Sequence, residues 1–379
     1  MIDQISPKVQ FILDRAIGGA TRRIRTAGPS LIVVRIQIAS GENTPYPHRT
    51  MSECTLLRPF LLIPLAFGAV LLAQPTRPPF TKADFEGAMK ELSNWGRWGT
   101  ADELGALNLI TPEKRREAAK LVREGIPVSL SHVAEKEKAA DNPRPFVHEM
   151  LSTSATPGAQ SHSDSFTVAH HGLAHTHLDA LCHFFYDGRM YNGFAREEVT
   201  AKGAAKLSVF AVHNGIFTRG VLMDIPRLKG VPYLEPGVRI FPEDLEAWER
   251  KTGVRVGPGD ALLLRWGRWA RRAAIGPFST EEGAAGFDVS VLPWLKKRDV
   301  ALLGWETPGY VPQPAGDLPR NAVHDFALAI LGIHLLDRAD FEAVSEAAAR
   351  RNRWEFMLTI APLPIPNGTG SPVNPIAMF

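Results

Sequence analysis

The sequence predicts a mixed α/β domain over residues 85–379, and three observations support this fold class. The chain has 379 residues, of which 45% are hydrophobic and 22% are charged, as in ordinary globular proteins. Strand-like apolar runs alternate with helix start and stop signals, without a strict βαβ rhythm. The 32 glycines and 30 prolines have no short period, so a repeat array or a collagen-like region is excluded.

The segment before this domain has a different character. Residues 60–73, FLLIPLAFGAVLLA, carry no charge and follow an arginine and an internal methionine, as in a secretory signal. We expect residues 1–50 to be a non-native upstream extension or disordered, 51–74 to be a signal peptide or membrane anchor, and 75–84 to be a linker. The expected location is periplasmic or secreted, with transient membrane contact through 60–73; a cytoplasmic or membrane-anchored protein is the alternative.

Three helices have clear start and stop signals. Thr111 is an N-cap residue followed by proline at the first helical position, and Gly125 closes this helix of about three turns. A second helix is expected at 242–251, closed by Gly253, and Asp340 is expected to cap a third over FEAVSEAAARR.

Six apolar runs predict strands: 127–133, 165–170, 220–225, 260–266, 300–306 and 355–363. No GxGxxG motif follows a strand and no glycine-rich GK[ST] loop exists, so a nucleotide-binding fold lacks support. The sequence GTGSP at 368–372 lacks the G-x-S-x-G spacing of a nucleophile elbow.

Charge and cysteine content exclude two further classes. The 43 basic and 40 acidic residues leave a formal charge of +3, and no basic block is interleaved with aromatic residues, so no nucleic-acid partner is expected. Two cysteines cannot form a disulfide framework, and Cys182 is interpreted as a small packed residue.

Histidines are concentrated in one short segment. Five of the 12 histidines lie at 170–183. The positions of His175, His177, Asp179 and His183 differ by even numbers, so on a strand they share one face. If the chain turns helical after Asp179, the i,i+4 spacing still keeps Asp179 and His183 on one face. Imidazole and carboxylate ligands without cysteine favour an open catalytic metal site over a structural zinc site. The alternative is a polar strand edge with solvated histidines.

The stretch THLDALCH at 176–183 resembles the signature H-x-G-T-H-x-D-x-P-x-H of the cyclase family, which includes bacterial kynurenine formamidase and isatin hydrolase. Segments 191–193, 220–237, 259–269 and 361–377 are similar to larger members, so the resemblance covers nearly all of 85–379. It implies a swivelling β/β/α fold with a central mixed sheet, assembled as a homodimer or homotetramer. It also implies hydrolysis of a small-molecule amide, an aryl formamide or cyclic lactam, with one or two Zn²⁺ or Mn²⁺ ions.

The resemblance also implies roles for individual residues. His177 and Asp179 match metal ligands, and the aspartate bridges the ions in two-metal members. His183 matches the proton donor and acceptor. His324 and Asp337 match the pair that completes the second metal site, with aspartate in place of the usual glutamate.

The match departs from the signature at its first ligand, because Leu173 stands where the signature has histidine. Either His175 or His171 supplies the missing ligand, or the site holds one ion; we name His175 as the candidate. His334 is either a core histidine or a hydrogen-bond partner of Asp337, three residues later.

The chemistry expected of such a site is hydrolysis by a metal-activated water. A divalent ion lowers the pKa of its water from ~15.7 towards ~7, and His183 would carry the proton to the amide nitrogen. The alternative is a catalytically degenerate metal-binding protein on the same scaffold. A protein that only binds metal has no use for a proton carrier, so His183 favours the enzyme. The tryptophans Trp95, Trp98, Trp266, Trp269 and Trp305 could line an aromatic pocket, although large aromatic residues are more often core.

Overall fold

The computed structural model describes residues 80–379 except 280–282, 308–310, 312–317 and 320. The described residues all belong to one compact unit, Gln74–Phe379. The segment 1–74 lies outside the described residues, so its assignment to an upstream extension and an export signal stays a prediction. In the part of the chain that is described, no helix is long and apolar enough to span a bilayer.

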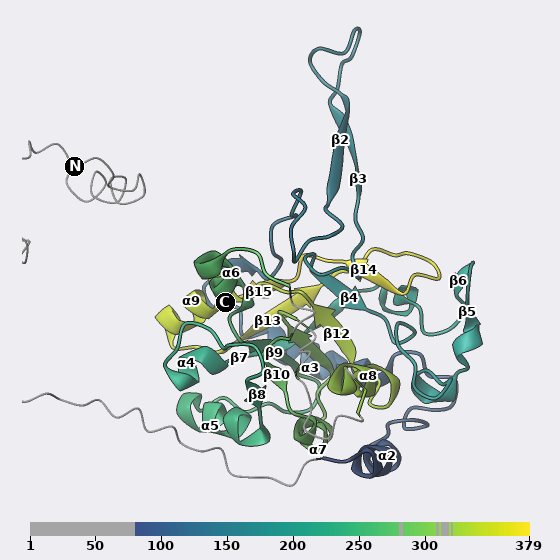
Figure 1. Ribbon diagram of the computed structural model, residues 1–379, viewed down its shortest axis with the longest axis vertical. Helices are drawn as coiled ribbons and strands as arrows, with labels where there is room; N and C mark the ends of the chain where they lie inside the picture. The colour runs from purple at the N-terminus through teal and green to yellow at the C-terminus, as the bar shows by residue number, and fades with distance from the viewer. Residues whose placement is uncertain (1–79, 280–282, 308–310, 312–317, 320) are drawn as a thin grey trace, which may run out of the picture. The chain divides into compact units, whose positions relative to one another are not determined.

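A nine-stranded mixed sheet forms the centre of this unit, in the order β1-β15-β13-β7-β9-β11-β12-β4-β14 (Figure 1). Its strands are β1 Pro127–Ser129, β4 His177–Asp179, β7 Ile216–Asp224, β9 Ala261–Arg265, β11 Leu302–Trp305, β12 His334–Asp337, β13 Glu355–Ile360, β14 Gly370–Pro372 and β15 Ile376–Met378. The adjacent strands β7, β9, β11 and β12 run parallel to one another. All the remaining neighbouring strands of this sheet pair antiparallel. The predicted mixed α/β fold with a central mixed sheet is therefore confirmed.

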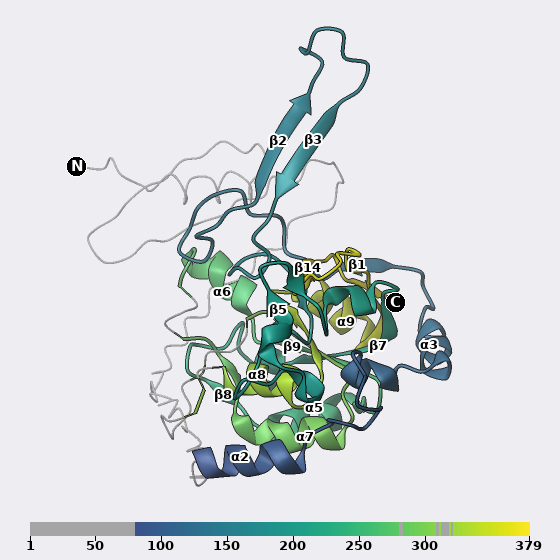
Figure 2. The ribbon, with the colours of Figure 1, turned by 90° about the vertical axis from the view of Figure 1, so that its right-hand side faces the viewer.

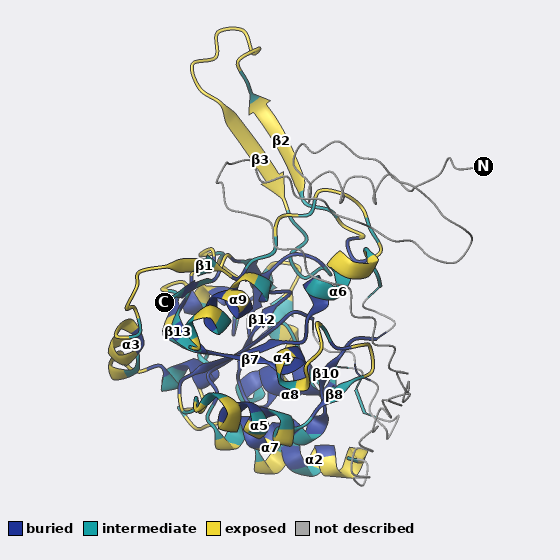
Figure 3. Ribbon diagram, turned by 90° about the vertical axis from the view of Figure 1, so that its left-hand side faces the viewer, coloured by how far each residue is buried: buried dark blue, intermediate teal, exposed yellow. Residues whose placement is uncertain are grey.

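The four parallel strands are almost wholly buried, and they are dark blue in Figure 3. Strands covered on both faces read as continuous apolar runs, which explains why ALLL at 261–264 showed no alternation. Helices α4 and α5 pack beside β9 and β7, and α8 packs beside β12. The α-helices are α2 Lys82–Glu91, α3 Pro112–Ala119, α4 Ile225–Lys229, α5 Pro242–Thr252, α6 Arg268–Ile275, α7 Leu292–Lys297, α8 Ala322–Ala329 and α9 Glu342–Arg351.

The three predicted helices are present, with shifted ends. Thr111 caps α3 by accepting a hydrogen bond from the Lys114 N–H at 3.2 Å. This helix ends at Ala119, well before Gly125, whose N–H donates to the Phe379 carbonyl at 2.9 Å. Helix α5 ends at Gly253, whose φ of 74° is left-handed as predicted. Helix α9 begins two residues after Asp340, whose carboxylate accepts from the Glu342 N–H at 3.0 Å.

A long hairpin projects from the sheet and its helices. Strands β2 Val147–Ser152 and β3 Ser163–Thr167 pair antiparallel, and Figure 2 shows them extending away from the rest of the unit. The run predicted at 165–170 therefore contributes to this exposed hairpin and not to the central sheet. Smaller elements are β5 Val199–Thr200, β6 Gly203–Ala204, β8 Arg239–Ile240 and β10 Gly286–Phe287, with 3₁₀ turns Gly105–Leu109, Tyr191–Gly193, Arg196–Glu198, Val209–Val212 and Val289–Val291. Helix α2 begins inside the stretch 75–84 that was expected to be a linker.

Candidate metal centre

Strand β4 brings the central histidine and aspartate together with an acid from another part of the chain. It lies between β12 and β14, antiparallel to both. His177 is directly opposite Asp337 of β12, so these two side chains lie on the same face of the sheet. Asp179 is opposite Gly370 of β14. The strand ends there, and a turn closed by a 2.9 Å bond from the His183 N–H to the Ala180 carbonyl brings His183 back towards Asp179.

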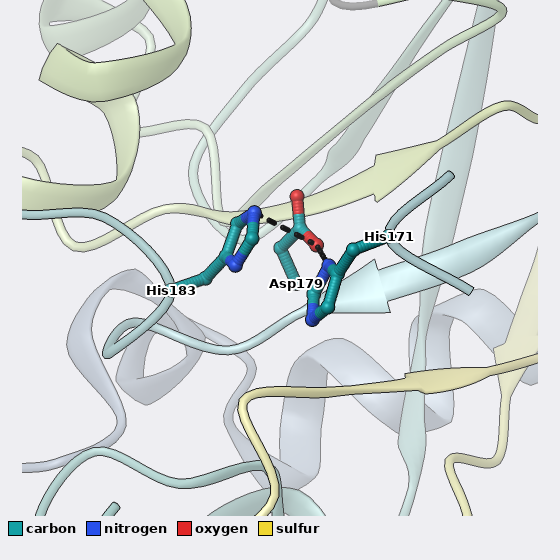
Figure 4. Close-up of side chains that lie close together, drawn as sticks. All are labelled: His171, Asp179 and His183. Carbon is teal, nitrogen blue, oxygen red and sulfur yellow. Dashed lines mark ion pairs between the residues drawn. The ribbon is translucent and has the colours of Figure 1, made fainter. Parts of the chain in front are cut away.

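Asp179 is the centre of the cluster and is completely buried. Its Oδ1 lies 2.9 Å from His171 Nδ1, 3.4 Å from His177 Nε2 and 3.9 Å from His183 Nε2. Figure 4 shows the approach of His171 and His183 to this carboxylate. On the other side, Oδ2 lies 3.4 Å from His324 Nε2.

Neither oxygen of Asp179 has a hydrogen-bond partner among the residues that the structure describes. A buried carboxylate without donors is costly unless a cation compensates it. Burial raises its pKa, but the neighbouring His183 and His177 outweigh burial and hold that pKa well below the ordinary value. The group is therefore an ionised carboxylate with free lone pairs, as a metal ligand must be.

Two sets of side chains have ligand atoms close enough to hold an ion. One set is His171, Asp179 and His183, and the other is His177, Asp179 and Asp337; within each, the ligand atoms lie within 4.8 Å of one another. Both sets share Asp179, whose two oxygens could bridge two ions. The donor set of imidazole nitrogens and carboxylate oxygens fits Zn²⁺, Mn²⁺ or Fe²⁺.

The backbone orients His177 for ligation. Its Nδ1 donates to the His175 carbonyl at 2.8 Å, which leaves the lone pair on Nε2, the nitrogen that approaches Asp179. Burial lowers the pKa of His177 to about 3 and that of His183 to about 4. Both rings are therefore neutral near pH 7, with a nitrogen able to bind a metal or a proton.

Asp337 is held by a residue of the neighbouring strand. The Trp305 indole N–H of β11 donates a hydrogen bond to Asp337 Oδ1, while Oδ2 lies 3.8 Å from His324 Nε2. Burial, together with the charge of Asp179, raises the pKa of Asp337 to about 6. Burial lowers the pKa of His324, but the Asp179 and Asp325 carboxylates, each 3.4 Å from one of its ring nitrogens, outweigh burial and raise that pKa to about 10. A bound cation would stabilise the ionised forms of the neighbouring Asp179 and Asp337 carboxylates.

The structure brings together five of the six predicted site residues: His177, Asp179, His183, His324 and Asp337. His175 is in neither ligand set, and its ring instead lies 6.0 Å from that of Phe146.

His171, the other candidate for the missing ligand, is the residue that reaches Asp179. Thr369 orients it through a 3.0 Å contact between Oγ1 and His171 Nε2. Gly370 leaves room for it, because a Cβ there would lie 2.7 Å from His171 Cε1. Thr369 and Gly370 were not among the predicted site residues, although GTGSP was compared with a nucleophile motif and lies in the segment 361–377 that is similar to larger cyclase members.

Two other candidates are core residues. His334 is fully buried, and neither ring nitrogen has a hydrogen-bond partner within the described ranges, so the hydrogen bond to Asp337 is not formed. Burial lowers its pKa to about 4, which keeps the ring neutral. Cys182 is buried, and burial raises the pKa of its thiol to about 12, in agreement with a packed residue.

The chain is similar to proteins of one family. Residues 117–310 match the cyclase family model, described as "Putative cyclase". Over 113 residues the chain is 32% identical to kynurenine formamidase from Geobacillus thermodenitrificans; the match covers 30% of this chain and 46% of that protein, less than half its length.

One solved structure supports this match. The crystal structure of a novel cyclase is 30% identical, with a TM-score of 0.67, over 77% of this chain and 99% of that one. Isatin hydrolase A from Ralstonia solanacearum is 19% identical, with a TM-score of 0.46, over 69% of this chain and 95% of that one. The matched residues 117–310 include β4 with His177 and Asp179. The chain belongs to the cyclase family.

Proposed function

We propose that this protein is a metal-dependent hydrolase that cleaves a small amide, an aryl formamide or a cyclic lactam. The observation that carries the proposal is Asp179, a completely buried carboxylate without a hydrogen-bond partner in the described part of the chain. Imidazole nitrogens of four histidines approach it from both sides. The similarity to kynurenine formamidase supports an amide as the substrate.

The side chains of the cluster around Asp179 form a deeply buried side and a side that is partly exposed to solvent. His177 and His324 have side chains that are only 3% exposed. His177, Asp179 and Asp337 would hold an ion on the deep side, and His324 would join them as a ligand once the ion displaces its proton. His171 and His183 are each 23% exposed and lie on the side that a substrate can reach. A divalent ion would supply a water whose pKa is lowered towards ~7 and an electrophile for the amide carbonyl.

His183 is proposed as the proton carrier. Its Nε2 is 3.9 Å from Asp179, the longest of the four histidine contacts, so it fits a role beside the ion better than His171, at 2.9 Å. Its neutral imidazole can accept a proton from water and deliver it to the amide nitrogen, which is a poor leaving group until protonated. The Phe184 ring, 4.6 Å from that of His324, offers an apolar surface beside the same cluster.

A degenerate metal-binding protein is the second candidate, because Leu173 replaces the opening histidine of the family signature. The 2.9 Å approach of His171 to Asp179 weighs against it, since this neighbour can restore the missing nitrogen ligand.

The experiment is a hydrolysis assay with N-formylkynurenine, isatin, and related lactams and esters. The purified protein is assayed as isolated, after chelation, and after reloading with Zn²⁺ or Mn²⁺. We expect turnover of at least one amide or lactam that disappears on chelation and returns on reloading. Turnover that survives complete removal of metal contradicts a metal-dependent hydrolase. Metal binding without turnover of any compound in the series favours the degenerate binding protein.

A further inference from the structure

The segment that carries His171 has no regular structure of its own. Residues 168–176, between β3 and β4, contain turns and bends but neither a helix nor a strand. His171 nevertheless places its Nδ1 2.9 Å from Asp179 Oδ1 (Figure 4). Because no helix or sheet hydrogen bonding fixes this backbone, contacts with other parts of the chain must hold it in place.

Two side chains from outside the segment hold it near His171. Thr369 contacts the imidazole ring itself, with its Oγ1 3.0 Å from Nε2. Arg268 holds the backbone, because its Nη2 donates a hydrogen bond to the Leu173 carbonyl at 2.6 Å. Leu173 is only two residues from His171, and consecutive Cα atoms are about 3.8 Å apart. A displacement of the Leu173 carbonyl would therefore move the backbone of His171 as well.

Arg268 is attached to the ends of two buried strands. It is the first residue of α6, and the preceding Gly267 has a left-handed φ of 84°. The backbone N–H groups of residues 266–268 all donate to Glu306 Oε2, at 2.8, 2.7 and 3.2 Å. In return, Arg268 Nη1 donates to the Glu306 carbonyl at 3.1 Å. The guanidinium also lies over the Trp269 ring, 4.2 Å from its centroid. These contacts join Arg268 to the ends of β9 and β11.

Ion pairing does not account for Arg268. The residue is only 3% exposed, and burial lowers its pKa to about 9. The Asp141 carboxylate lies 3.7 Å from its Nη2, but the same oxygen accepts a hydrogen bond from Arg272 Nε at 2.7 Å. A buried charge without a close counter-ion is costly. The hydrogen bonds of Arg268 to backbone carbonyls are therefore its main polar contacts, and one of them leads to the metal centre.

We propose that Arg268 is a positioning residue of the metal centre, which places His171 beside Asp179 by holding the Leu173 carbonyl. Leu173 stands where the family signature has a histidine. This position would thus act through its backbone, while the nitrogen ligand comes from two residues earlier. The proposal rests on the metal site of the proposed function, but it concerns the affinity for the ion and not turnover.

Arg268→Met tests this role, because methionine keeps an unbranched side chain and removes the donors. The Zn²⁺ affinity of the purified full chain is measured by competition with a chelating dye. We expect the variant to bind Zn²⁺ about 10–100-fold more weakly, as for loss of a group that orients a ligand. Unchanged affinity overturns the proposal.

A second background separates positioning from a general loss of structure. In His171→Gln, the imidazole through which Arg268 acts is gone. Adding Arg268→Met to this variant should therefore change the Zn²⁺ affinity by no more than about twofold, which is the precision of such cycles. A purely structural role would weaken Zn²⁺ binding by the same factor in both backgrounds, and that result overturns the proposal.

Arg268→Lys and Arg298→Met complete the comparison. Lysine keeps the charge and a donor but lacks the planar fork that spans two carbonyls, so its Zn²⁺ affinity should fall between those of the original chain and Arg268→Met. Arg298 also donates to a backbone carbonyl, that of Val256 at 3.3 Å, and to Glu249 at 2.6 Å. Arg298→Met should lose stability in urea and keep its Zn²⁺ affinity. If Arg268→Met does not fold, Arg268→Lys takes its place in both backgrounds.

The same measurements separate this proposal from the proposed function. If the original chain binds Zn²⁺ and Arg268→Met binds it equally well, the positioning role is wrong and the hydrolase is unaffected. If the original chain binds no Zn²⁺, both proposals are wrong. An equal loss of Zn²⁺ affinity in Arg298→Met would show that destabilisation alone weakens metal binding, and it too overturns the positioning role.

Discussion

The imidazole rings of His171 and His183 stack face to face, with their centroids 3.9 Å apart and their planes within 3°. They approach the same oxygen of Asp179, at 2.9 Å for His171 and 3.9 Å for His183. Leu173 stands where the family signature has histidine. His171, two positions earlier, places its Nδ1 beside the Asp179 carboxylate. The stack therefore pairs a proposed replacement ligand with a proposed proton carrier.

Glutamine at each of these two positions should separate the roles. His171→Gln should lower metal occupancy, because it removes the nitrogen nearest Asp179. His183→Gln should keep its metal and lose turnover by about 10²–10⁴-fold, the usual contribution of a general acid–base group. Metal content by mass spectrometry and turnover under saturating substrate measure both effects. His213→Gln, at an exposed histidine, is the control. Loss of metal in His183→Gln would make this residue a ligand and leave the proton to another group.

Trp305→Phe should weaken metal binding without disturbing the fold. The variant keeps an aromatic ring but removes the N–H that holds Asp337 Oδ1. Loss of a group that orients a ligand typically lowers metal affinity by about 10–100-fold. The control is Trp294→Phe, since the Trp294 indole N–H has no partner among the described residues. Equal metal affinities of the two variants, measured by competition with a chelating dye, would show that the bond to Asp337 is unimportant.

Gly370→Ala should destabilise the protein by about 1–3 kcal/mol, as overpacking of a core does. The added Cβ would lie 2.6 Å from the Leu178 carbonyl oxygen and 2.7 Å from His171 Cε1. Gly87→Ala, in helix α2, meets no atom within 4 Å and should stabilise by about 0.5–1 kcal/mol. Urea unfolding of both variants provides the comparison. A neutral Gly370→Ala would mean that β14 can move away from β4.

Glu306 should make stability depend on pH. Burial and the nearby Glu342 raise the pKa of Glu306 from 4.5 to about 8. Between these values the unfolded chain releases a proton that the folded chain retains, so the native state loses stability as pH rises, by at most about 1.4 kcal/mol per unit. Glu306→Gln lacks this titration. Urea unfolding of metal-free samples at several pH values should show the original chain declining relative to the variant. A constant difference would mean that the carboxyl is ionised in the fold.

The sequence predicted the buried strands well, because parallel strands covered on both faces read as uninterrupted apolar runs, as at 261–264. It also predicted the N-cap at Thr111 and the left-handed stop at Gly253, which are local properties. It did not predict that Gly125 would bond to Phe379 and leave its helix, since that partner is distant in the chain.

The candidate site also has residues that local sequence pattern predicts and residues that it does not. His177 and Asp179 share a face because of strand alternation, which is readable from spacing. The order of strands β12, β4 and β14 is a long-range property, so the positions of Thr369 and Gly370 beside His171 could not be derived from local pattern. Even spacing also suggested His175, but β4 begins only at His177 and that alternation does not extend back to it.

Metal content of Asp179→Asn tests the central claim most directly, because both ligand sets share this carboxylate. The original chain, the variant and the control Asp187→Asn, at an exposed left-handed position, are loaded with Zn²⁺ or Mn²⁺, dialysed and analysed by mass spectrometry. We predict one or two bound ions in the original chain and in Asp187→Asn, and little or none in Asp179→Asn. Full metal content in a folded Asp179→Asn variant, or none in the original chain, would contradict the account.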